Sequence, residues 1–161
     1  MLLHGIGPDG GANGTWMSCI ECQLAQGCNG DLIVIRGKDA DGKEIPVSLT
    51  AEVTADKRPR WKKGGEVRTF TKGQLWWNQH DLDFKEELDT RGKNDVESKL
   101  GEWTRVECFC EGKRIRVFVN GKQVNEAYDV YPAAGKILLQ TEGFEILFRK
   151  FEIQPLKKDK N

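Results

Sequence analysis

The amino-acid sequence predicts an all-β fold, a two-sheet antiparallel β-sandwich or jelly roll, from three observations. Apolar and polar residues alternate with period two in most segments, whereas helical periodicity is scarce. The apolar runs are short, and turns that contain Gly separate them. Hydrophobic residues make up 38% of the 161 residues and charged residues 31%, which is typical of a globular chain with its own core. Many short strands with Gly-rich turns pack most readily as two layered sheets.

The alternation also predicts which face of each strand is apolar. In the segment 17–24, Ile20 and Cys22 share the apolar face, whereas Glu21 and Gln23 lie on the opposite face. The Asn-Gly pair at 120–121 predicts a type I′ hairpin, because both positions of that turn require positive φ. The other expected strands are residues 31–36, 46–53, 105–110, 114–119 and a closing pair at 136–142 and 145–154.

A single domain is expected over residues 1–161, because no linker, repeat or change in composition divides the chain. The segment at about 58–99 is polar, contains Gly and is poorly periodic, so it is predicted to be a long irregular excursion. Loops of this length often carry binding function. Residues 1–4 already have the character of the interior of a strand.

Charge and hydropathy exclude some classes of partner. Lys plus Arg equals Asp plus Glu at 25 each, which argues against nucleic acid as a partner. No apolar run approaches the roughly 20 residues of a transmembrane helix, and no signal peptide is visible.

Five cysteines are present, and we expect them to be small buried hydrophobic residues rather than metal ligands, since no second Cys-x-x-Cys follows Cys19 and Cys22. No cofactor is expected, although a divalent cation is compatible with the sequence.

An ordered set of short motifs runs through nearly the whole chain and resembles one family. The motifs are Leu2-Leu3-His4-Gly5, Ile20-Glu21-Cys22-Gln23-Leu24, Gly30-Asp31, Gly101-Glu102-Trp103, Val119-Asn120-Gly121, Gly135-Lys136-Ile137-Leu138-Leu139-Gln140, Glu142-Gly143, Phe148-Arg149 and Pro155-Leu156. With these motifs the chain is similar to the 3-keto-disaccharide hydrolase domain family, whose fold is a concanavalin-like jelly roll related to lectins and glucanases. Thr104 and Lys150 depart from that family's usual asparagines.

The resemblance implies a glycoside hydrolase-like enzyme that cleaves glycosides already oxidised at C3, in the periplasm or outside the cell. A ketone at C3 acidifies the proton on C2, so the site needs a base and a group that holds the enolate. His4 suits the base because its ordinary pKa lies near neutrality. Glu21 and Glu142 are the alternative catalytic residues. An ordinary glycosidase mechanism is also open, with Glu21 and Glu142 as the carboxylate pair.

The carbohydrate ligand is expected to lie in a groove on one sheet face. Amide and guanidinium groups would bind sugar hydroxyls there, and a tryptophan would stack on the ring. Lectins and hydrolases share this sandwich, so a carbohydrate-binding module without catalysis stays an alternative. The predicted substrate-binding residues are Gln23, Trp16, Trp77, Gln140 and Arg149.

The family's opening strands have no counterpart in this sequence, so the sandwich is expected to lack its N-terminal strands. A sheet that lacks strands exposes edges and core, which favours association. We therefore predict that the isolated chain forms a homodimer or aggregates, as measured by light scattering. A monodisperse monomer with a cooperative melting transition would contradict this prediction.

Overall fold

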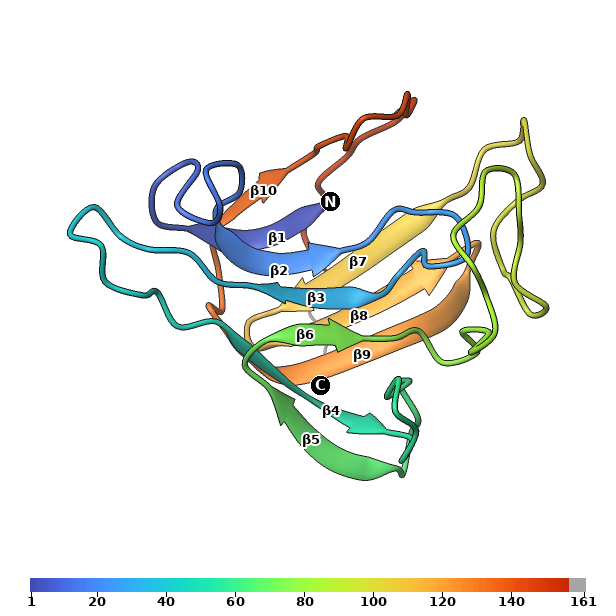
Figure 1. Ribbon diagram of the computed structural model, residues 1–161, viewed down its shortest axis with the longest axis horizontal. Coiled ribbons are helices and arrows are strands. Elements are labelled where there is room, and N and C mark those ends of the chain that lie inside the picture. The colour runs from blue at the N-terminus through green and yellow to red at the C-terminus, as the bar shows by residue number, and fades with distance from the viewer. Residues whose placement is uncertain (157–161) are drawn as a thin grey trace.

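The computed structural model describes residues 1–156, which form ten strands and no helix. Two five-stranded antiparallel sheets lie face to face (Figure 1), so the predicted all-β sandwich is confirmed. The first, called here the groove sheet, has the order β10-β1-β2-β3-β6, and the second, the back sheet, has the order β5-β4-β9-β8-β7. The strands are β1 (Leu2–Ile6), β2 (Ser18–Cys22), β3 (Leu32–Ile35), β4 (Ser48–Val53), β5 (Glu66–Phe70), β6 (Gly73–Leu75), β7 (Val106–Glu111), β8 (Arg114–Val119), β9 (Lys122–Tyr131) and β10 (Lys136–Leu138).

Alternating residues of both sheets form one core between them. Burial of this apolar surface is the main force that holds the two sheets together. The groove sheet contributes residues from β1, β2, β3 and β6, and the back sheet contributes residues from β4, β8 and β9. The core residues include Leu3, Ile20, Cys22, Leu32, Val34, Leu75, Leu49, Ala51, Val53, Ile115, Val117, Val119, Ala127 and Val130.

One buried polar side chain in this core joins the sheets directly. Asn125 of β9 is fully buried, and its Nδ2 donates to the carbonyls of Gly30 at 3.0 Å and Leu75 at 3.1 Å. Its Oδ1 accepts from the backbone N–H of Glu126 at 3.0 Å. A buried amide whose donors and acceptor are all satisfied does not carry the usual penalty of burial. Asn125 therefore fixes β9 against two segments of the groove sheet.

The strands with clear alternation form where the sequence predicts them. β2 and β3 lie within the expected segments, and β8 has the predicted bounds. Asn120 and Gly121 have φ of 48° and 77°, the positive values expected at the turn between β8 and β9.

The predicted excursion at 58–99 is partly wrong, because it contains two strands. β5 pairs with β4 along its whole length, and β6 pairs with β3. Both strands are short and carry exposed polar residues, so their alternation is weak in the sequence. The later part of this excursion, residues 76–99, has no strand, in agreement with the irregular segment expected there.

The predicted closing strand pair is also wrong. Only β10 forms, and residues 145–154 have no strand. β10 pairs with β1 at Leu138 and Leu2, and the segment after it pairs with no strand among the described residues. Its large apolar residues, among them Phe144 and Leu147, are exposed.

Nowhere in residues 1–156 does the chain form a helix long and apolar enough to span a bilayer.

Replacement of Asn125 tests the contact between the sheets. We expect Asn125→Leu to lower the free energy of unfolding by about 2–4 kcal/mol, because two buried carbonyls lose their donor while the volume is kept. The measurement is urea denaturation. The exposed Asn94 supplies the control, since Asn94→Leu should change stability by no more than about 0.5 kcal/mol. Equal stabilities for the two variants would contradict the role given to Asn125.

Candidate functional site

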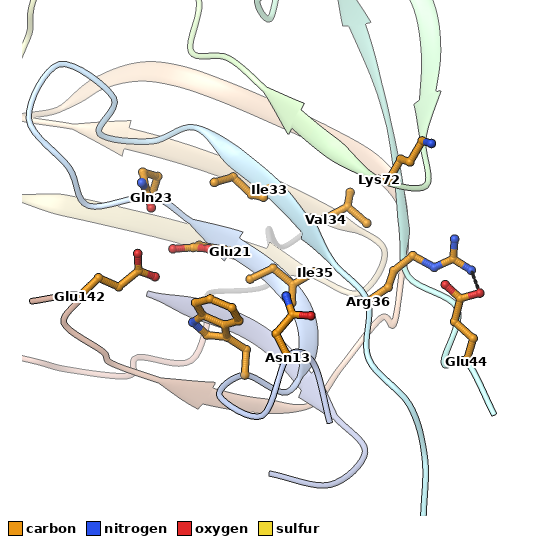
Figure 2. Close-up of a pocket in the computed structure, with 11 residues that line it drawn as sticks. Asn13, Glu21, Gln23, Ile33, Val34, Ile35, Arg36, Glu44, Lys72 and Glu142 are labelled. Carbon is orange, nitrogen blue, oxygen red and sulfur yellow. Dashed lines mark ion pairs between the residues drawn. The ribbon is translucent and has the colours of Figure 1, made fainter. Parts of the chain in front are cut away.

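A groove of about 510 Å³ lies on the groove sheet (Figure 2). Its wall and floor come from β2, from β3 and from loops that follow β1, β3, β5 and β10. Figure 2 shows polar groups at both ends, with isoleucine side chains between them. The lining residues are Asn13, Trp16, Glu21, Gln23, Ile33, Val34, Ile35, Arg36, Glu44, Lys72 and Glu142.

Glu21 is placed in the groove by the alternation of β2. Its neighbours Ile20 and Cys22 point into the core, so Glu21 points to the opposite face. In the ladder it lies opposite Leu2 of β1 and Ile33 of β3, one on each side. These apolar neighbours cover most of the side chain, and only 7% of Glu21 is exposed. A carboxylate therefore lies nearly buried in the groove, as the sequence predicts for its face.

The surroundings of Glu21 favour its protonated form. Burial is the largest cause that raises the pKa of Glu21, and the negative charge of Glu142 raises it further. The positive N-terminus acts in the opposite direction but does not cancel them. A carboxylate that loses hydration in this way is a stronger base than an exposed one.

Trp16 and Gln23 also line the groove. Trp16 lies in the loop between β1 and β2, where its carbonyl accepts from the N–H of Ala12 at 2.8 Å. Among the described residues its indole Nε1 has no hydrogen-bond partner, although that atom is buried. The N–H of Gln23 donates to the Asp31 carbonyl at 2.9 Å, which holds the end of β2 against the start of β3.

Glu142 and Gln140 lie in the segment after β10. Glu142 points into the groove toward Glu21 in Figure 2, and the amide of Gln140 donates to Glu142 Oε1 at 2.9 Å. Gln140 itself does not line the groove. Its position makes it a support for Glu142 rather than a direct ligand of the sugar.

Sequence reasoning missed the residues at the other end of the groove. Arg36 forms an ion pair with Glu44 at 3.0 Å, and Lys72 in the turn between β5 and β6 lies near them in Figure 2. Ile33 and Ile35 separate this end from Glu21. The one available signal was the run 32–35, whose apolar residues on both faces indicated that the outer face of β3 is also covered.

His4, predicted as the base, does not line the groove. Alternation from Leu2 would place His4 on the outer face, but β1 has a bulge between Leu3 and Ile6. His4 has a φ of 56° within this bulge, and its Nδ1 lies 2.8 Å from the carbonyl of Pro132. A bulge redirects a side chain in this way. His4 is thus a buried, hydrogen-bonded residue outside the groove.

Trp77 and Arg149 also lie elsewhere. Trp77 is 2% exposed, and its Nε1 donates to the Gly27 carbonyl at 2.9 Å, so it packs in the core instead of facing a ligand. The guanidinium of Arg149 lies over the ring of Trp103, 4.3 Å from its centroid. This cation–π contact occupies the face of the aromatic ring that a sugar would need.

The fold and the groove define a class: a two-sheet β-sandwich with an open polar groove on one sheet. The model of one family, described as a 3-keto-alpha-glucoside-1,2-lyase-like domain, matches residues 10–154, and the chain belongs to that family. This membership confirms the resemblance seen in the motifs and connects the chain with carbohydrate chemistry. No curated protein and no solved structure matches the chain significantly.

The raised pKa of Glu21 predicts a pH dependence of stability. Because the folded pKa exceeds the unfolded value of about 4.3, the folded state holds more protons between these two values, and stability falls as the pH rises through this window. Glu21→Gln should remove this loss, so the variant should be more stable than wild type at pH 7 and lose that advantage below about pH 4.

Urea denaturation between pH 3.5 and 8 measures both effects. Glu145 is exposed and outside the groove, so Glu145→Gln serves as the control and should follow the wild-type curve. Parallel curves for wild type and Glu21→Gln would show that burial does not perturb Glu21.

Proposed function

We propose that the protein cleaves glycosides oxidised at C3 by an elimination reaction in which Glu21 is the base. The observation that carries this proposal is a nearly buried carboxylate, with a raised pKa, in a groove wide enough for a sugar. The family description supplies the substrate class, a 3-keto-glucoside. Glu21 replaces His4 in this role because His4 lies outside the groove.

The reaction needs one base and one group that stabilises an oxyanion. The carboxylate of Glu21 takes the proton from C2, and the C–H electrons form an enolate with the C3 carbonyl. The enolate then collapses, a double bond forms between C1 and C2, and the bond between C1 and the glycosidic oxygen breaks. The departing oxygen takes a proton from solvent, and addition of water across the new double bond completes a net hydrolysis.

Gln23 is the residue that we assign to the enolate. It lies two residues beyond Glu21 on the same face, and its amide supplies a neutral N–H donor in the groove. A donor fixed in place before the reaction stabilises developing negative charge without reorganisation. Lys72 at the other end of the groove carries a positive charge that favours an anionic intermediate as well, whereas the charge of Arg36 is neutralised by Glu44.

Trp16 and the isoleucines are assigned to binding. An indole ring and aliphatic side chains offer the apolar surface that the C–H face of a sugar requires. Asn13 and Glu142 supply further hydrogen-bonding groups around the sugar.

The test is release of aglycone from a 3-keto-glucoside, compared with the unoxidised glucoside. We expect turnover of the keto sugar only, and a fall in kcat of about 10²–10⁴-fold in Glu21→Gln, since a general base contributes about that much. Trp16→Ala should mainly raise KM, because stacking acts on bound substrate and transition state alike.

Glu145→Gln is the matched control, because it removes a carboxylate outside the groove and should keep wild-type turnover. Binding of the keto sugar without turnover by the wild type would contradict the proposal and would favour a carbohydrate-binding module. Full activity in Glu21→Gln would remove Glu21 from the mechanism.

A further inference from the structure

A second cluster of reactive side chains lies apart from the groove, where the loop between β2 and β3 meets the segment after β6. Among residues 1–156, Cys28, Asp31 and His80 each bring one potential metal-ligand atom within 4.8 Å of the other two. All three residues are almost completely buried, with exposed fractions of 1% or less. None of them belongs to the groove or to the reaction proposed above.

The loop geometry brings Cys28 and Asp31 together. The N–H of Asp31 donates to the Cys28 carbonyl at 3.1 Å, which closes a turn between them. Gly30 within this turn has a φ of 91°, and a Cβ there would lie 2.5 Å from Val124 Cγ2. The tight turn therefore requires Gly, and it holds the thiol and the carboxylate close to each other.

His80 carries an unsatisfied ring nitrogen in this buried position. Its Nδ1 lies 3.3 Å from the Gly27 carbonyl, and Nε2 has no partner within the described part of the chain. With the proton on Nδ1, the lone pair of Nε2 is unused. Burial lowers the pKa of His80, which favours this neutral form. A histidine that donates one N–H to a carbonyl and keeps its other nitrogen free has the arrangement of a metal ligand.

Several acidic side chains lie around Cys28 and Asp31, whereas Arg58 and Arg60 lie on the side of His80. Asp31 accepts hydrogen bonds from the Trp77 N–H and from Gln74 Nε2, both at 2.6 Å, yet burial still raises its pKa to about 8. Glu86 Oε1 lies 3.6 Å from Cys28 Sγ, and Glu97 Oε1 accepts from the Gly27 N–H at 2.8 Å. No Lys or Arg forms an ion pair with Asp31 in the described structure. A cation would neutralise this site.

We propose that Cys28, Asp31 and His80 form a binding site for a divalent ion of the zinc class, with Glu86 in reach of a fourth position. A thiolate and an imidazole select Zn²⁺ or Co²⁺ over Ca²⁺ and Mg²⁺, which prefer oxygen ligands only. Metal–ligand bonds of about 2.0–2.3 Å need ligand atoms roughly 3.5 Å apart, so a small contraction of the cluster is sufficient. On binding, the Cys28 thiol loses its proton to solvent, and the sulfur bonds to the ion.

Such an ion would connect two segments that lie far apart in the sequence. Cys28 and Asp31 come from the loop that also holds Gln23 at one end of the groove, and His80 lies in the strandless part of the chain after β6. The role is therefore structural, and it stabilises the folded state in proportion to the occupancy of the site. It does not depend on the proposed reaction.

The test is titration of the full-length, reduced, metal-free protein with Co²⁺, followed by absorption spectroscopy. We expect about one equivalent to bind, with a thiolate-to-cobalt charge-transfer band and the visible bands of a tetrahedral ion, and Zn²⁺ should displace it. Cys28→Ser should lose the charge-transfer band, and His80→Gln should weaken binding by more than about tenfold. Zn²⁺ should also raise the Tm of the wild type but not of Cys28→Ser.

Cys110→Ser is the matched control, because it removes a cysteine of β7 outside the cluster and should keep the spectrum. Circular dichroism checks that each variant is folded. If a variant does not fold, the Co²⁺ titration of the wild type by itself tests the proposal. Absence of a stoichiometric thiolate band in the wild type, or an unchanged band in Cys28→Ser, overturns the proposal. Because the readout is the absorption spectrum of bound Co²⁺, a negative result for the metal site is independent of a negative result in the sugar-cleavage assay.

Discussion

The contact of Asn125 with the opposite sheet sets the geometry on which the rest of the molecule depends. Its amide holds the carbonyls of Gly30 and Leu75, which lie where β3 begins and where β6 ends. β9 is irregular at this position, since its register with β8 shifts between Val117 and Phe118. Hydrophobic burial is not directional, whereas two hydrogen bonds from one buried amide allow a single relative position of the sheets. Gly30 precedes β3, which lines the groove, and lies between Cys28 and Asp31 of the buried cluster, so the contact with Asn125 positions both sites.

The contact at Gly30 also determines where the groove lies, because β3 follows Gly30 and its residues alternate between the core and the outer face. Leu32 and Val34 enter the core, so Ile33 and Ile35 must face the groove. Antiparallel pairing with β2 then places Glu21 beside Ile33. A shift of one residue in this register would exchange Glu21 with a core residue, and burial of a charge between the sheets would oppose it. The hydrophobic pattern thus specifies the location of the reactive carboxylate.

Local patterns were sufficient to predict β2, β8 and the face of Glu21, because alternation and an Asn-Gly turn depend on neighbouring residues only. They were not sufficient for His4, because neither the bulge in β1 nor the contact of His4 with the distant Pro132 is visible in the local pattern. Trp77 directly follows Trp76, and adjacent residues of a strand point in opposite directions. The prediction that Trp77 faces a ligand was wrong because the sequence does not tell which of the two tryptophans is buried. The strand predicted at 145–154 was wrong, because alternation within a segment does not tell whether a partner strand lies beside it.

The Cys28 cluster was beyond local reasoning for a different reason. Cys19 and Cys22 have the spacing of a metal-binding pair, but they lie on opposite faces of one strand. The neighbours of Cys28 include His80, which is far away in the sequence. That distance is closed by the pairing of β6 with β3 and by the turn after Trp77. Topology, and not spacing, therefore decides which reactive groups meet. It gives this chain two separate places where polar groups are buried at a cost in stability, the groove with Glu21 and the cluster beneath the strandless segment. The well-packed core between the sheets offsets that cost.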